Sequence, residues 1–70
     1  MKKLSLLDFC GASRIIVDSY MQSINYSIYE VVRIENVEVY TVVYKLNSKN
    51  LKIIDCYFDK NNNLYGIQFR

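Results

Sequence analysis

The sequence predicts an α+β fold, in which an N-terminal amphipathic helix packs on one face of a four-stranded antiparallel β-meander. Three observations carry this prediction. Apolar residues recur at helical spacing over the first third of the chain, four runs rich in β-branched and aromatic residues follow, and Asn-containing turns separate those runs. At 70 residues the chain is expected to form a single domain, 1–70.

The helix is expected over about residues 5–25. Ser5 followed by Asp8 resembles a capping box at its start, and Asn25 is a suitable end because asparagine tolerates the left-handed conformation. The side expected to be buried carries Leu6, Phe9, Cys10, Ser13, Ile16, Val17, Tyr20, Met21 and Ile24.

The strands are expected over about residues 26–34, 37–46, 51–59 and 64–70. Pairing them outward from the turns predicts one aliphatic face beneath the helix, because alternate residues of a strand point the same way. Val43 is expected opposite Ile54, and Cys56 opposite Ile67. The predicted inward set is Ile28, Glu30, Val32, Ile34, Val37, Val39, Thr41, Val43, Ile54, Cys56, Phe58, Tyr65, Ile67 and Phe69.

The opposite face is predicted to be rich in tyrosine and uncovered, with Arg33 opposite Glu38 and Tyr57 opposite Gly66. An antiparallel sheet can leave one face to water without any function. A contiguous tyrosine patch rimmed by charge is nevertheless typical of protein interfaces. The residues predicted to bind a partner are Tyr29, Val31, Tyr40, Val42, Tyr44, Ile53 and Tyr57.

This register makes a prediction about two neighbouring residues. Val39→Asp is expected to unfold the protein by burying a charge, whereas Tyr40→Lys is expected to leave the fold intact and to weaken association.

Catalytic, cofactor-binding and metal-binding residues are not expected. The chain has no histidine and no glycine-rich phosphate loop. Glu30 is the one acid predicted on the aliphatic face, and an edge position that reaches solvent is the favoured interpretation. The run 59–63 has the oxygen spacing of a calcium loop, but Leu64 and Arg70 stand where glycine and glutamate are required, so a hairpin turn is predicted.

Lys45, Lys49 and Lys52 gather around the second turn and suggest an alternative, a small nucleic-acid-binding regulator. Acids on the tyrosine face, such as Asp55, would repel phosphates, and the net charge is only +2. Nucleic acid is therefore the less favoured partner.

The favoured function is a small non-enzymatic protein–protein interaction module, which acts as a homodimer in the cytoplasm and not at a membrane. Asn, Ile, Lys and Tyr make up 28 of the 70 residues, which hints at an AT-rich genome. A phage or mobile-element inhibitor of a host protein, of the anti-defence type, fits that composition. Cys10 and Cys56 are interpreted as reduced buried residues, with a disulfide as the alternative.

Overall fold

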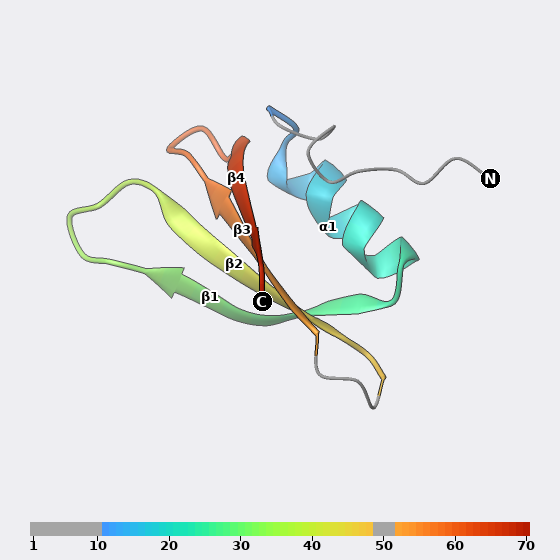
Figure 1. Cartoon of the computed structure of the whole chain (residues 1–70). Coiled ribbons are helices and arrows are strands. Elements are labelled where there is room, and N and C mark those ends of the chain that lie inside the picture. Colours follow the sequence, from blue (N-terminus) through green and yellow to red (C-terminus); the bar gives the residue numbers. More distant parts are fainter. Residues whose placement is uncertain (1–10, 49–51) are drawn as a thin grey trace.

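The computed structural model describes residues 11–48 and 52–70, and it confirms the α+β prediction. Helix α1 (Arg14–Ser23) is followed by strands β1 (Tyr26–Arg33), β2 (Tyr40–Leu46), β3 (Ile53–Phe58) and β4 (Leu64–Phe69). The strands form one antiparallel sheet in the order β1-β2-β3-β4. Figure 1 shows α1 lying across one face of this sheet.

The helix begins at Arg14, later than predicted, and residues 11–13 are not helical. Gly11 has a positive φ of 89°, and the backbone of residues 11 and 12 bonds to β4 instead: the Gly11 N–H donates to the Leu64 carbonyl at 2.7 Å, and the Leu64 N–H donates to the Ala12 carbonyl at 2.8 Å. The Gly11 N–H and the Ala12 carbonyl are therefore bonded to β4 and cannot form the hydrogen bonds of a helix that begins earlier. The predicted capping box at Ser5 lies outside the described residues, whereas Asn25 ends the helix with φ 69°.

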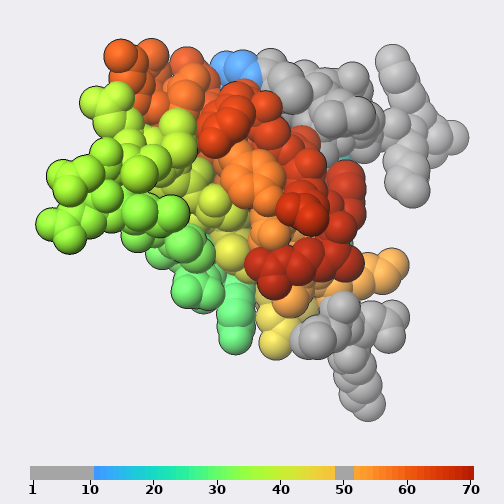
Figure 2. All heavy atoms as spheres, turned by 60° about the vertical axis from the view of Figure 1, so that its left-hand side comes forward, coloured from blue at the N-terminus to red at the C-terminus, as the bar shows by residue number. Residues whose placement is uncertain are grey.

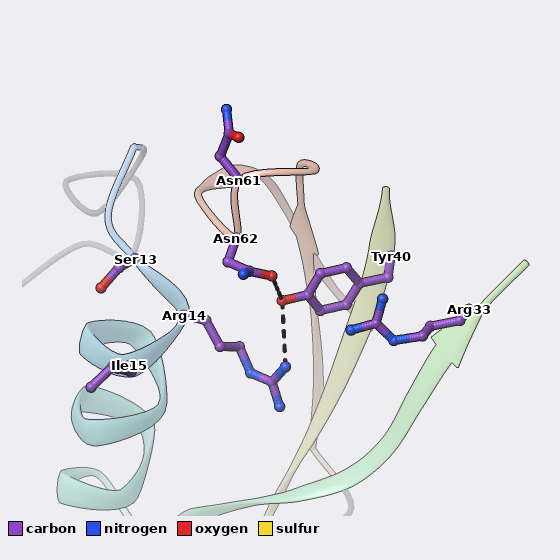
Figure 3. A pocket seen from close by; sticks show the side chains of 7 residues that line it. All are labelled: Ser13, Arg14, Ile15, Arg33, Tyr40, Asn61 and Asn62. Atoms are coloured by element: carbon purple, nitrogen blue, oxygen red, sulfur yellow. Dashed lines mark hydrogen bonds between the residues drawn. The ribbon is translucent and has the colours of Figure 1, made fainter. Parts of the chain in front are cut away.

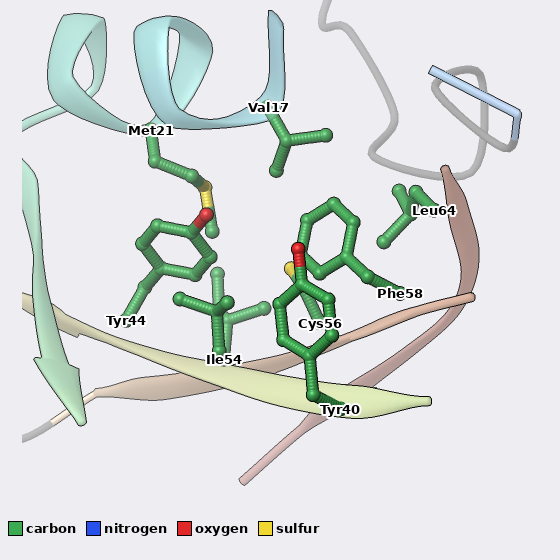
Figure 4. Close-up of a cluster of buried hydrophobic side chains, with 9 residues drawn as sticks. Val17, Met21, Tyr40, Tyr44, Ile54, Cys56, Phe58 and Leu64 are labelled. Carbon is green, nitrogen blue, oxygen red and sulfur yellow. The ribbon is translucent and has the colours of Figure 1, made fainter. Parts of the chain in front are cut away.

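Strand β2 lies in a different register from the predicted one, and the prediction for its two faces is wrong. Val42 pairs with Cys56, and Tyr44 pairs with Ile54, so β2 is shifted by one residue against β3. A one-residue slip turns every side chain of a strand to the other face. As a result, Tyr40 and Tyr44 point toward α1 (Figure 4), and Val42 belongs to the same buried cluster.

The slip against β3 runs through the whole β2–β3 pairing, from Lys45–Ile53 to Tyr40–Phe58, so it originates between these two strands. The first hairpin also differs from its prediction, by a two-residue shift that leaves the relative facing of β1 and β2 at Arg33 unchanged. A two-residue turn at Glu35-Asn36 was predicted, but the strands end at Arg33 and restart only at Tyr40, so Arg33 faces Tyr40 and not Glu38. A β-bulge between Ile28 and Glu30 adds a further shift in β1. Because β-bulges and longer loops change the register, outward counting from the turn failed here.

The third hairpin was predicted correctly over residues 54–57 of β3, but not at its turn end. A register shift after Tyr57 pairs Phe58 with Leu64, so Leu64 is buried and Tyr65, which was predicted to point inward, is exposed. Cys56 pairs with Ile67, and Tyr57 pairs with Gly66, where an added Cβ would lie 3.1 Å from the Tyr57 ring. The turn itself is closed by the Asp59 side chain, whose Oδ1 accepts the backbone N–H groups of Asn61 at 2.9 Å and Asn63 at 3.0 Å. This is hairpin chemistry, as expected for the failed calcium-loop pattern.

The core lies between α1 and the sheet. Val17 and Met21 of the helix pack on side chains from β2, β3 and the start of β4 (Figure 4). The buried cluster consists of Val17, Met21, Tyr40, Val42, Tyr44, Ile54, Cys56, Phe58 and Leu64. Val43 and Asp55, which alternate with this set, are also buried although they point away from the helix.

Candidate functional site

The predicted tyrosine patch is not one surface. Tyr40, Val42 and Tyr44 are only 4%, 0% and 1% exposed, so the prediction that they form an open face is wrong. Tyrosine rings can be buried here because their hydroxyls find polar partners: the Tyr44 hydroxyl donates to Asp18, and the Tyr40 hydroxyl donates to Asn62 at 2.6 Å.

The other members of the predicted patch remain at the surface but are spread over two faces. Tyr29 and Val31 are exposed on β1, whereas Ile53 and Tyr57 are half-buried on the face away from α1. Lys45 lies 5.4 Å from the centre of the Tyr29 ring, and the Tyr57 hydroxyl donates to Gln68. These residues cannot form the single docking face that the sequence suggested.

A different apolar surface follows β1 and the loop after it. In β1, residues 27–33 are all exposed, and the loop that follows is exposed as well. Figure 2 shows these segments in green at the side of the sheet face that α1 leaves uncovered. We call the exposed apolar residues here the edge patch; they are Ile28, Tyr29, Val31, Val32, Ile34, Val37 and Val39.

The two edges of the sheet differ. The start of β4 is paired on its outer side by the segment before α1, through the Gly11 and Ala12 bonds to Leu64 and a bridge between Ser13 and Asn63. Among the described residues, no backbone pairs with β1 on its outer side. An unpaired edge strand is a template for another chain.

The lysine-rich tip is only partly described. Lys45 is half-buried beside Tyr29, Lys52 is exposed, and Lys49 lies outside the described residues. Nucleic-acid contact by Lys45, Lys49 and Lys52 therefore stays a prediction.

An open hollow of about 500 Å³ lies between the start of α1, the end of β1 and the β3–β4 turn (Figure 3). The Arg33 guanidinium lies 4.0 Å from the centre of the Tyr40 ring, and that of Arg14 lies 5.7 Å from it. The sequence pattern did not single out Arg14. Its spacing of four residues from Asp18, at which helical side chains meet, was the available signal.

A polar network fixes one wall of this hollow. Arg14 Nε contacts both carboxylate oxygens of Asp18, at 3.1 and 3.2 Å, and Arg14 Nη1 lies 3.4 Å from the Tyr40 hydroxyl. Burial acts to lower the pKa of Arg14, but the Tyr40 hydrogen bond and the charge of Asp18 raise it above its ordinary value. Burial, the hydrogen bond to Asp18 and the charge of Asp18 raise the pKa of Tyr44. Arg14 thus stays charged and Tyr44 stays neutral.

Cys56 is a free, fully buried thiol, and Cys10 lies outside the described residues. Burial first, and then the charges of Asp55 and Asp18, raise the pKa of Cys56 from 9.0 to about 12. A group with this pKa does not form the thiolate that a nucleophile requires.

The Cys56 thiol makes stability depend on alkaline pH. The native thiol keeps its proton up to about pH 12, whereas the unfolded chain loses it near pH 9. The free energy of unfolding should therefore fall as the pH rises from 9 toward 12. Urea titrations across this range should show a shallower fall for Cys56→Ala than for the native sequence. Equal slopes would contradict the assignment of a buried neutral thiol.

Glu30 is exposed on the edge strand β1, in agreement with the favoured edge interpretation. It pairs with Val43, however, and so lies on the face away from α1 and not on the predicted aliphatic face. Within residues 11–48 and 52–70, no group of three or more potential ligands could hold a metal ion, and no helix is long and apolar enough to cross a membrane. Comparison with family models, curated proteins and solved structures found no match to this chain.

Proposed function

We propose that the protein is a small non-enzymatic binding module that receives an extended segment of another protein along β1. The observation that supports this most directly is an eight-residue edge strand with only Tyr26 partly covered. Backbone hydrogen bonds along such an edge would supply affinity, and pockets for alternate side chains would supply specificity.

The partner's chemistry follows from the regular part of the strand after the bulge. Glu30 and Val32 point away from the helix side, whereas Val31 and Arg33 share the face of Val42 and Tyr40. An antiparallel segment would fit best with apolar residues opposite Val31 and Val32, a basic residue opposite Glu30 and an acidic residue opposite Arg33. From its N-terminus, such a segment is acidic, apolar, apolar, basic.

A second copy of the chain does not meet this requirement. In a two-fold pairing of two β1 edges, residues directly opposite each other belong to the same face of their own sheets. Glu30 and Arg33 lie on opposite faces, so no such register pairs them with each other. A register centred on Glu30 or Arg33 would place that residue opposite its own copy, so that two like charges meet. Registers centred on Val31 or Val32 would place both Glu30 and Arg33 opposite uncharged residues.

An inhibitor encoded by a phage or mobile element would use the same surface, by occupying an extended segment of its host target. Composition supports that role, through the abundance of Asn, Ile, Lys and Tyr. A contiguous exposed apolar surface such as the edge patch is typical of a protein that functions in complex with a partner.

The test uses two peptides of equal composition. Thr-Thr-Glu-Val-Val-Lys-Thr-Thr carries the complementary order, and Thr-Thr-Lys-Val-Val-Glu-Thr-Thr carries the reverse. We expect the first to shift the backbone amide signals of residues 28–33 in NMR titrations and to bind roughly threefold to tenfold more tightly than the second. The double variant Glu30→Lys/Arg33→Glu should invert this preference.

Matched variants separate binding at the β1 edge from binding elsewhere on the sheet. Val31→Lys/Val32→Lys should fold normally, because both positions are exposed, and should lose peptide binding. Tyr65→Lys places a charge at the opposite edge of the sheet and should bind normally. Binding to neither peptide would refute the proposal. Sedimentation equilibrium showing a dimer that Val31→Lys/Val32→Lys dissociates would assign the edge to a second copy instead.

A further inference from the structure

We propose that the hollow between the start of α1, the end of β1 and the β3–β4 turn binds an oxyanion, either a phosphate monoester or a carboxylate. This site does not depend on a partner at β1. In Figure 3, the side chains of Arg14, Arg33, Tyr40 and Asn62 converge on one open space, while Ser13 and Asn61 stand at its rim.

The hollow has an excess of positive charge. Among the described residues, Arg33 has no carboxylate within ion-pair distance, and its guanidinium rests on the face of Tyr40 instead. Asp18 occupies Nε of Arg14, and Nη1 is directed at the Tyr40 hydroxyl in the wall of the hollow. Asp18 is the one acid paired in this cluster, so one of the two arginine charges is uncompensated. An anion between them would relieve their mutual repulsion.

The donors are held in place before any ligand arrives. The Tyr40 ring is buried and stacks on Phe58 with centroids 5.5 Å apart, so it provides a fixed support for both guanidinium groups. Asn62 accepts the Tyr40 hydroxyl through Oδ1, so its amide nitrogen is free to donate to a ligand. Planar guanidinium forks match the paired oxygens of phosphate and carboxylate groups.

The size and rim of the hollow indicate a ligand larger than a bare ion. A volume of about 500 Å³ lies in the range of small-molecule sites. Ile15 lines the hollow and is 76% exposed, so it offers apolar contact to the carbon portion of a ligand. An oxyanion on a small organic group therefore suits the lining better than free phosphate does.

The experiment is an NMR titration of ¹⁵N-labelled protein at constant ionic strength with phenyl phosphate, benzoate and inorganic phosphate. We expect saturable shifts of the Arg33 Nε–H and the Asn62 side-chain amide with at least one of the two aromatic anions. Tighter binding of phenyl phosphate would identify a phosphate monoester as the preferred ligand, and tighter binding of benzoate would identify a carboxylate. Inorganic phosphate should bind more weakly than the preferred aromatic anion.

Variants test whether the guanidinium fork is responsible. Arg33→Gln should weaken binding at least about tenfold, and Arg33→Lys should restore only part of the affinity because it keeps the charge but not the fork. Lys52→Gln removes the same charge near the β2–β3 turn, at the other end of the strands, and should bind as the native protein does. The proposal is overturned if no anion gives saturable shifts, or if Lys52→Gln weakens binding as much as Arg33→Gln.

Discussion

Val42→Asp is expected to prevent stable folding, whereas Val39→Asp is expected to give a folded protein. Val42 is 0% exposed and lies in the centre of the sheet beneath α1, between β1 and β3. A carboxylate there would lose its hydration without gaining a partner, at a cost of about 4 kcal/mol or more. A core of this size supplies only about 3–5 kcal/mol of net stability, so the native state would not survive.

The same substitution at Val39 is the control. Val39 is 38% exposed and precedes β2, so its new carboxylate would remain in water. Circular dichroism and thermal melts of the two variants provide the measurement. The sequence-based register predicts the reverse order, with Val39→Asp unfolded. A folded Val42→Asp together with an unfolded Val39→Asp would contradict the structure, because it would mean that Val39 is buried under α1 and Val42 is at the surface.

Phe58→Ala should have the second largest effect, a loss of about 3–5 kcal/mol in the free energy of unfolding. Phe58 is fully buried, stacks on Tyr40, and belongs to the same cluster as Val17 and Leu64. Its removal would leave a cavity that strands on both sides hold open, and it would also release the ring that supports the hollow.

Phe69→Ala is the matched control for that substitution. Phe69 was predicted to share the inward face with Phe58, but it is 64% exposed at the end of β4. Its truncation should change the free energy of unfolding by no more than about 0.5 kcal/mol. Urea denaturation of both variants measures the difference. Equal losses would place Phe69 in the core and contradict the observed packing.

The position of the candidate docking surface depends on the facing of one strand. The edge patch contains Val32, Ile34, Val37 and Val39, which the predicted register assigned to the core, whereas Tyr40 and Tyr44 moved from the predicted surface to the interior. The valine and isoleucine side chains that this facing leaves exposed lie at the β1 edge of the sheet. The candidate docking surface is therefore a strand edge, and a face-to-face contact through tyrosines is no longer needed.

Local features of the sequence determined the element types and most of the third hairpin. Asn25, Asn36 and Asn62 all adopt positive φ, because asparagine tolerates that conformation where a helix or strand must end. Tyr57 over Gly66, and the Asp59 side chain closing its turn, are contacts between residues close in sequence. Such contacts depend on spacing and turn chemistry alone, so they can be predicted from sequence.

The tertiary structure alone decided which face of β2 is buried. In β2 the outward face carries Thr41 and Lys45 beside Val43, while the buried face carries two tyrosines, whose hydroxyls also suit a surface. The alternation therefore favours the observed facing only weakly, and a one-residue change of register overrides it. The choice depends on partners distant in the chain: Asp18 and Asn62 satisfy the hydroxyls of Tyr44 and Tyr40, and the pairing of β2 with β3 sets the register. The hollow exists for the same reason, because it joins Arg14, Arg33 and Asn62 around a tyrosine that only this packing buries.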